Sequence, residues 1–240
     1  MSDAQDRSWI TRFLSIGLRP DQLFGTVRSG SLQQEAYVRQ LLKETHQKRL
    51  ALETPLQNVT FILLDTETTG FNADSDDIFA FSATKTKMGK PYESYSTLIK
   101  PSQPIPDAIQ ALTGINQEDV RFAPSMEDIL PKLLQFLTDG IILGYHIAFD
   151  LTFLNAYLKA NNQRRLPHQS FELRQLIEKL YQQSFPTLDD ALAFFNIPCE
   201  KRHTAEGDVK AMADLWSKLY DRFQELHLAT LYDLYALVGR

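Results

Sequence analysis

A strand that runs directly into two acidic residues is the feature that most limits how this 240-residue chain can fold. Residues 59–64 form a continuous, partly β-branched apolar run, and Asp65-Thr66-Glu67 follows at once. Such a run is typical of a strand that is buried on both faces of a sheet. The i, i+2 spacing puts the carboxylates of Asp65 and Glu67 on one side of an extended chain, where they repel each other unless a cation lies between them. Oxygen ligands of this kind suit hard cations such as Mg²⁺ or Mn²⁺.

A further acid follows a second apolar run. Residues 141–143 predict a short strand, and a loop connects it to a predicted helix over residues 148–160 that carries Phe149-Asp150. Asp150 has mostly apolar neighbours in the sequence, and an acid in such a segment needs a partner if it is buried. An acid placed in a first helical turn to suit the helix dipole explains it equally well.

The third acidic segment is His203-Thr204-Ala205-Glu206-Gly207-Asp208, at the start of a predicted helix over residues 205–219. Two helical residues five positions apart are rotated by about 500°, so they do not share a face. His203 is therefore expected in the loop, with Asp208 in the first turns of the helix. Gly207 costs helix stability relative to alanine, which indicates that another group approaches closely beside Asp208.

The rest of the pattern predicts a mixed α/β sheet flanked by helices. Strands are expected over residues 59–64, 78–84, 92–99 and 141–143, with residues 169–173 as a candidate for part of a fifth. Further helices are expected over residues 105–112, 124–137, 171–183, 188–195 and 223–238.

The first 57 residues differ from the rest of the chain. Leu32, Leu41 and Leu50 lie among charged and amide residues as on an amphipathic helix, a shorter helix is expected over residues 9–14, and Pro55 ends the helical pattern. The sequence therefore predicts a helical extension over residues 1–57 and a main domain over residues 58–240. Packing of the extension against the main domain is favoured over docking of a partner.

Composition restricts the class of protein. Lys and Arg number 25 against 30 Asp and Glu, a net charge of −5, which excludes a strongly basic nucleic-acid-binding domain. An enzyme that grips a nucleic acid at one end remains compatible with this charge, because divalent metals supply positive charge. No apolar run approaches the about 20 residues that cross a membrane. The single cysteine, Cys199, and the absence of a secretory signal favour a reducing compartment, and a cytoplasmic location is expected.

The order of the three acidic motifs carries a family resemblance. Asp-x-Glu after a strand, Phe-Asp in a mid-chain helix and His-x4-Asp near the end occur together with Ile99-Lys100-Pro101 and Leu112-Thr113-Gly114-Ile115. From about residue 59 to residue 219, the chain resembles the DnaQ-like 3′→5′ exonucleases of the DEDDh class, a family within the ribonuclease H-like fold that includes polymerase proofreading subunits.

The resemblance implies a mixed five-stranded sheet and the hydrolysis of single-stranded DNA or RNA from the 3′ end, with release of 5′-mononucleotides. It implies that Asp65, Glu67, Asp150 and Asp208 bind two divalent metal ions, Mg²⁺ or Mn²⁺, and that His203 is the general base. The residues that it implies for substrate binding are Thr66, Thr113, Gly114, Ile115, Tyr145, His146 and Phe149.

The chain departs from the family pattern in three places. Ala80 stands where the second strand commonly has an acid, and Tyr145-His146 stands where a His-Asn pair is common. The segment over residues 166–173 lacks the usual Asp-Thr pair and has Glu172 near its end. These departures concern contacts with substrate rather than the four metal-binding acids.

Three alternatives remain open at this stage. One is a module that binds nucleic-acid ends without cutting them, although all five catalytic positions hold the expected residue types. Another is a proofreading subunit that docks a DNA polymerase through the helical extension or the last helix. The third is an internally cutting ribonuclease H-type enzyme, against which His203 before Asp208 argues. The sequence does not distinguish DNA from RNA, because recognition of the 2′-hydroxyl depends on contacts that motifs do not show.

Overall fold

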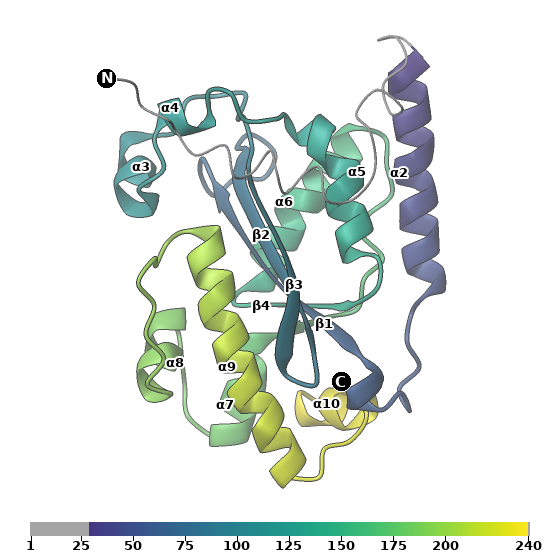
Figure 1. Cartoon of the computed structure of the whole chain (residues 1–240), viewed down its shortest axis with the longest axis vertical. Coiled ribbons are helices and arrows are strands. Elements are labelled where there is room, and N and C mark those ends of the chain that lie inside the picture. Colours follow the sequence, from purple (N-terminus) through teal and green to yellow (C-terminus); the bar gives the residue numbers. More distant parts are fainter. Residues whose placement is uncertain (1–28, 240) are drawn as a thin grey trace, which may run out of the picture. The chain divides into compact units, whose positions relative to one another are not determined.

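Five strands form one mixed sheet, in the order β3-β2-β1-β4-β5, in a computed structural model that describes residues 29–239 (Figure 1). The chain divides into two units, residues 1–37 and residues 38–240, and the second contains the whole sheet. Helix α2 (Ser29–Gln47) crosses the boundary between them. Among the described residues, no helix is both long enough and apolar enough to span a membrane.

The strand pairing confirms the predicted mixed sheet. β1 (Thr60–Thr68), β2 (Ile78–Lys87) and β3 (Lys90–Leu98) form an antiparallel meander. β4 (Ile141–Gly144) pairs in parallel with β1, and β5 (Ser170–Glu172) pairs in parallel with β4. Because the chain enters β1 and β4 from the same edge, the carboxyl ends of both strands lie at one edge of the sheet.

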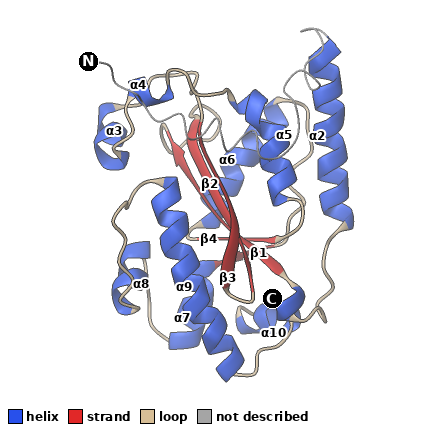
Figure 2. Cartoon of the chain, in the orientation of Figure 1, coloured by secondary structure: helices blue, strands red, loops and turns tan. Residues whose placement is uncertain are grey.

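Helices surround the sheet (Figure 2). Those between β3 and β5 are α3 (Asp107–Thr113), α4 (Gln117–Val120), α5 (Met126–Leu137) and α6 (Ile147–Ala160). Those after β5 are α7 (Leu173–Tyr181), α8 (Leu188–Phe194), α9 (Ala205–Glu225) and α10 (Leu231–Leu237), and a short 3₁₀ turn, η3 (Leu56–Asn58), precedes β1.

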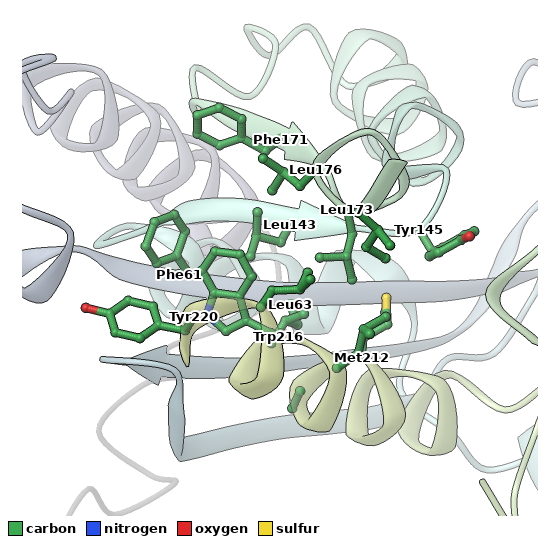
Figure 3. Packing of buried hydrophobic residues seen from close by; sticks show 14 of the residues in the cluster. Phe61, Leu63, Leu143, Tyr145, Phe171, Leu173, Leu176, Met212, Trp216 and Tyr220 are labelled. Carbon is green, nitrogen blue, oxygen red and sulfur yellow. The ribbon is translucent and has the colours of Figure 1, made fainter. Parts of the chain in front are cut away.

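Alternate residues of β1 pack into opposite layers, as expected for a strand buried on both faces. Phe61 and Leu63 belong to the hydrophobic cluster formed with helices α7 to α10, whereas Ile62 and Leu64 belong to the cluster formed with α5 and α6. At the centre of the first cluster, the fully buried ring of Trp216 in α9 lies 4.6 Å from that of Phe61 (Figure 3). This packing fixes α9, which carries Asp208, against β1, which carries Asp65 and Glu67.

Two predicted helices near the end of the chain were wrong in their extent. Residues 171–183 begin as strand β5 rather than as helix, because the side chain of Glu172 caps the amino end of α7. The helix predicted over residues 223–238 is two segments: α9 continues to Glu225, and α10 starts after Thr230, whose hydroxyl and Asp233 form a capping box.

Two further predictions concern smaller elements. Helix α4 was not predicted, and its amino end is set by a capping box between Asn116 and Asp119. The helix expected over residues 9–14 lies outside the described residues. The boundary between residues 57 and 58 stays a prediction.

Candidate active site

Three acidic side chains meet where β1 ends and α9 begins. Asp65 and Glu67 come from the last residues of β1, and Asp208 comes from the first turns of α9. One carboxylate oxygen of each lies within 4.8 Å of the others. The i, i+2 spacing therefore does place Asp65 and Glu67 on the same side, and the packing of α9 on the sheet brings Asp208 to them.

Asp150 has a defined partner. Its carboxylate is only 3% exposed, and its Oδ1 accepts hydrogen bonds from the backbone N–H and the hydroxyl of Thr66, at 2.8 and 2.7 Å. Thr66 points away from Asp65 and Glu67 because it lies between them in the strand. It thus connects the first turn of α6 to the acidic end of β1, although Asp150 lies outside the group of three closely spaced oxygens.

The electrostatics show that these acids are crowded. Burial, followed by the charges of Asp150, Glu67 and Asp208, raises the pKa of Asp65 well above its ordinary range. Burial and the same kind of repulsion raise the pKa of Glu67 to about 8. Burial also raises the pKa of Asp150 to about 7, against the opposing effect of its hydrogen bonds with Thr66.

Arg202 is the site residue that the sequence analysis did not assign. Its guanidinium donates two hydrogen bonds to Asp189, at 2.6 and 3.1 Å, and a third to Oδ2 of Asp208. It lowers the pKa values of Asp65 and Glu67. The arginine stands directly before His203 in the sequence, but nothing in the sequence shows that it reaches Asp208. From the sequence alone, Arg202 cannot be distinguished from a solvent-exposed arginine in a loop.

Gly207 confirms the predicted close approach, and the approaching group is the chain's own backbone. A Cβ atom at this position would lie 1.9 Å from the carbonyl oxygen of Lys201. The loop before α9 is therefore packed on the first turn of that helix. This contact holds Arg202 beside Asp208.

Glu172 is a second residue whose role the sequence did not reveal. Its carboxylate accepts hydrogen bonds from the backbone N–H groups of His146 and Ile147, at 2.9 and 3.1 Å. These groups lie at the start of α6, so the end of β5 fixes the helix that carries Asp150. Glu172, which stands in a segment that departs from the family pattern, therefore positions the helix that carries Asp150.

The residues expected to bind substrate differ in how exposed they are. Tyr145 is 7% exposed and its hydroxyl donates to the carbonyl of Phe185, so it is a core residue with no proton left to offer a substrate. His146 is exposed and its ring lies 3.1 Å from the carbonyl oxygen of Pro186. Phe149 is partly exposed beside Asp150.

The Thr113-Gly114-Ile115 segment lies at the end of α3. Thr113 is buried and donates its hydroxyl proton to Ile109, while Gly114 has the left-handed conformation that ends the helix. Ile115 is partly exposed. His203 lies in the loop before α9 and its backbone is left-handed, with φ at 58°. The structure gives it an electrostatic effect on Asp189.

The site has the chemistry of a divalent-metal site. Its donors are all carboxylate oxygens, and Oδ1 of Asp208 is buried without a hydrogen-bond partner. A divalent cation among these oxygens would offset the repulsion that raises the pKa values of Asp65 and Glu67, and it would give the unpartnered oxygen of Asp208 a ligand role. Asp65, Glu67 and Asp208 therefore fit a hard cation.

The structure thus combines a mixed sheet with carboxylates from β1, α6 and α9, and His203 stands in the loop before α9. The exonuclease family model named RNase T matches residues 62–216. The chain therefore belongs to this exonuclease family.

Similar sequences occur in several bacterial proteins. The epsilon subunit of DNA polymerase III from Aquifex aeolicus is 28% identical over 72% of this chain and 87% of its own length. A PolC-type DNA polymerase III from Caldanaerobacter subterraneus is 30% identical, and the 3′-5′ exonuclease DinG from Staphylococcus epidermidis is 31% identical. They match 72% and 74% of this chain, which spans only 12% and 20% of their lengths.

Solved structures show the same fold. The nuclease domain of 3′hExo, a DEDDh protein bound to rAMP, has a TM-score of 0.61 at 17% identity and matches 68% of this chain and 92% of that one. Exonuclease X with a 5′-overhanging duplex has a TM-score of 0.59 at 17% identity and matches 75% of this chain and 99% of that one.

The raised pKa values predict a pH-dependent stability of the metal-free protein. Between about pH 4.5 and 8, folded Glu67 retains a proton that the unfolded chain has released, so the free energy of unfolding falls as the pH rises. We expect Glu67→Gln to flatten this dependence in urea titrations with EDTA, whereas Glu53→Gln, an exposed control, leaves it unchanged. If the free energy of unfolding depends on pH equally in the wild type and in Glu67→Gln, the raised pKa of Glu67 is contradicted.

Gly207→Ala tests the packing of the loop before α9. In an ordinary helix this change stabilises by about 1 kcal/mol, but here the new methyl group must displace the Lys201 carbonyl. We expect a net loss of about 1–3 kcal/mol in the free energy of unfolding, the usual cost of overpacking. The exposed neighbour Glu206→Ala should stay within about 0.5 kcal/mol. A variant more stable than the wild type would rule out the close contact.

Arg202→Met tests whether the arginine orients Asp208. Groups that orient metal ligands typically contribute about 10–100-fold in affinity, so we expect Mn²⁺ binding in calorimetry to weaken by that factor. Arg121→Met removes an exposed arginine that pairs with Glu118 and serves as the control. Tighter binding in Arg202→Met would mean that the guanidinium competes with the cation instead of orienting its ligand.

Proposed function

We propose that this chain hydrolyses the 3′-terminal phosphodiester of single-stranded DNA or RNA and releases 5′-mononucleotides one at a time. The observation that carries this proposal is the meeting of Asp65, Glu67 and Asp208 with an unpartnered, buried oxygen on Asp208. Similarity to a 3′-5′ exonuclease supports the proposed direction of digestion, and the acid cluster supports the proposed metal-dependent chemistry.

In this proposal, Asp65, Glu67, Asp150 and Asp208 hold two Mg²⁺ or Mn²⁺ ions. When bound, such ions lower the pKa of water and offset the charge that develops at the phosphate. The protein's own contribution is to present the carboxylates. Thr66 fixes Asp150 through two hydrogen bonds, and Arg202 fixes one oxygen of Asp208 while leaving the other free.

His203 is proposed as the general base that accepts the proton of the attacking water. A histidine suits this role because its ordinary pKa of about 6.5 lies close to neutral pH. The loop that holds His203 is attached to the site at both sides: Arg202 binds Asp208, and Thr204 caps α9 by accepting a hydrogen bond from the N–H of Gly207. The loop that carries the proposed proton acceptor, His203, is therefore fixed relative to the metal-binding acid Asp208.

The 3′ end is proposed to enter between the end of α3 and the start of α6. The backbone at Thr66 and Glu67 contacts the terminal sugar, and the terminal base packs between Ile115 and Phe149. Thr113 and Gly114 shape this wall through the helix end that they form, and His146 lies exposed at its border. Stacking tolerates every base, so little sequence preference is expected.

Other functions of the whole protein are proposals of the same kind. Solved complexes of Escherichia coli exonuclease I contain single-stranded DNA, which favours single strands as the substrate here. The relation to an epsilon subunit of DNA polymerase III favours proofreading or repair with a polymerase partner, docked through residues 1–57 or the last helix. A cytoplasmic location is compatible with either role.

The direct test is digestion of 5′-labelled single-stranded DNA and RNA in Mg²⁺ or Mn²⁺. We expect a ladder that shortens by one nucleotide at a time from the 3′ end and that EDTA abolishes. His203→Ala should lower kcat/KM by about 10²–10⁴-fold, the usual contribution of a general base. Asp208→Asn should abolish the ladder, whereas Asp214→Asn, an exposed acid on the same helix, should not change it.

Two outcomes would overturn the proposal. Substrate that stays intact under both metals while it remains bound would identify a module that only binds nucleic-acid ends. Internal cleavage that yields fragments of many sizes at once would identify an endonuclease. A large preference for DNA or for RNA would instead define the substrate.

A further inference from the structure

A groove beside the candidate active site extends beyond Phe149, which is the one residue of its lining that the proposed function uses. We propose that it binds the phosphodiester backbone on the 5′ side of the terminal nucleotide, with Lys159 and Arg165 contacting phosphates. This inference rests on the proposed function, and it names the part of the substrate that the site recognises beyond the nucleotide it removes.

The groove is a cavity of about 630 Å³ between the exposed face of α6 and the loop after β1. Phe149, Thr152 and Lys159 line it from α6, Phe71 lines it from the loop, and Arg165 lines it from the segment after α6. Both walls of the groove are therefore connected to the site. One wall is α6, which carries Asp150, and the other is the loop that follows β1, the strand that carries Glu67.

The end of the groove near the acids is aromatic. Phe71 is 91% exposed, and its ring meets that of Phe149 edge to face at 6.3 Å. Phe149 directly precedes Asp150, which is part of the candidate metal site. An exposed aromatic pair at this point provides apolar surface on which bases stack. A substrate whose 3′ end reaches Asp150 therefore passes over these two rings.

The other end of the groove is basic. Lys159 and Arg165 are both exposed, and neither forms an ion pair within residues 29–239. Arg165 is positioned by its neighbour, since the N–H of Leu166 donates to the side chain of Asn155 in α6 at 2.8 Å. Asp74 is the one acid among the residues that line the groove, so the two cations outweigh it. Because neither charge is used in an ion pair among the described residues, both are available for phosphate.

The length of the groove identifies which nucleotides it binds. Phe149 and Lys159 are ten residues apart on one helix, which corresponds to about 15 Å along its axis. This distance extends well beyond the terminal nucleotide that lies at the acids. The cations therefore contact the strand upstream of the scissile bond, and they affect long substrates more than a single nucleotide.

The experiment compares two substrates in the double variant Lys159→Gln/Arg165→Gln. The p-nitrophenyl ester of thymidine 5′-monophosphate reports on the acids alone, and a single-stranded 12-mer also reaches the groove. We expect the ratio of kcat/KM for the 12-mer to that for the ester to fall at least about fivefold, through a higher KM. The control Lys43→Gln/Lys218→Gln removes two exposed positive charges elsewhere and should keep the wild-type ratio.

Binding provides a readout that needs no catalysis. In an Asp208→Asn background, the affinity for the 12-mer depends on salt, and each lost phosphate contact reduces the slope of log K against log salt by about 0.7. Removal of both cations should therefore reduce the slope by about 1.4. Thr152→Glu, which adds a negative charge to the exposed face of α6, should weaken 12-mer binding in the same direction.

The outcomes separate this inference from the proposed function. An unchanged substrate ratio and an unchanged salt slope in the double variant would overturn the groove assignment while the exonuclease itself remains. If the wild type hydrolyses neither substrate, the proposed function fails, and the salt slope still decides whether the groove binds the strand.

Discussion

Repulsion among buried carboxylates is the constraint on which this structure depends. Burial raises the pKa values of Asp65 and Glu67, and the charges of the neighbouring acids Asp150 and Asp208 raise them further. A fold that gathers such groups gives up stability at neutral pH unless a cation joins them. The hydrophobic layers on both faces of β1 supply the stability that tolerates this arrangement, since Phe61 and Leu63 are fully buried on one face and Ile62 and Leu64 on the other.

The supporting residues fix the orientation of the acidic side chains without fully neutralising their charge. Thr66 uses its backbone and its hydroxyl to hold Asp150, and Glu172 holds the helix on which Asp150 lies. Arg202 takes one oxygen of Asp208, but its charge is shared with Asp189. Because the charges of Arg202 and Asp189 nearly cancel, Arg202 orients Asp208 but leaves most of the negative charge of the site for a divalent cation.

The sequence predicts the site better than it predicts the residues that support it. Asp65 and Glu67 follow a strand whose apolar run fixes their face, and Gly207 signals a close contact at Asp208, so these were foreseeable from local pattern. The partners Thr66–Asp150 and Arg202–Asp208 could not be foreseen, because they form only when separate segments pack together. The same limit applies to the fold: the three-stranded meander follows from periodicity, and β5 lies within the candidate strand over residues 169–173, but the sequence also allowed a helix from residue 171 because the cap that Glu172 forms on α7 was not recognisable.

The distribution of charge explains how an acidic chain can act on a polyanion. The net charge of −5 repels nucleic acid in general, so attraction must be local. Two places meet that requirement: the acid cluster, which becomes attractive only with divalent cations, and the groove along α6, where Lys159 and Arg165 lack acidic partners among the described residues. A strand held at both places has its 3′ end at the acids and its backbone at the cations.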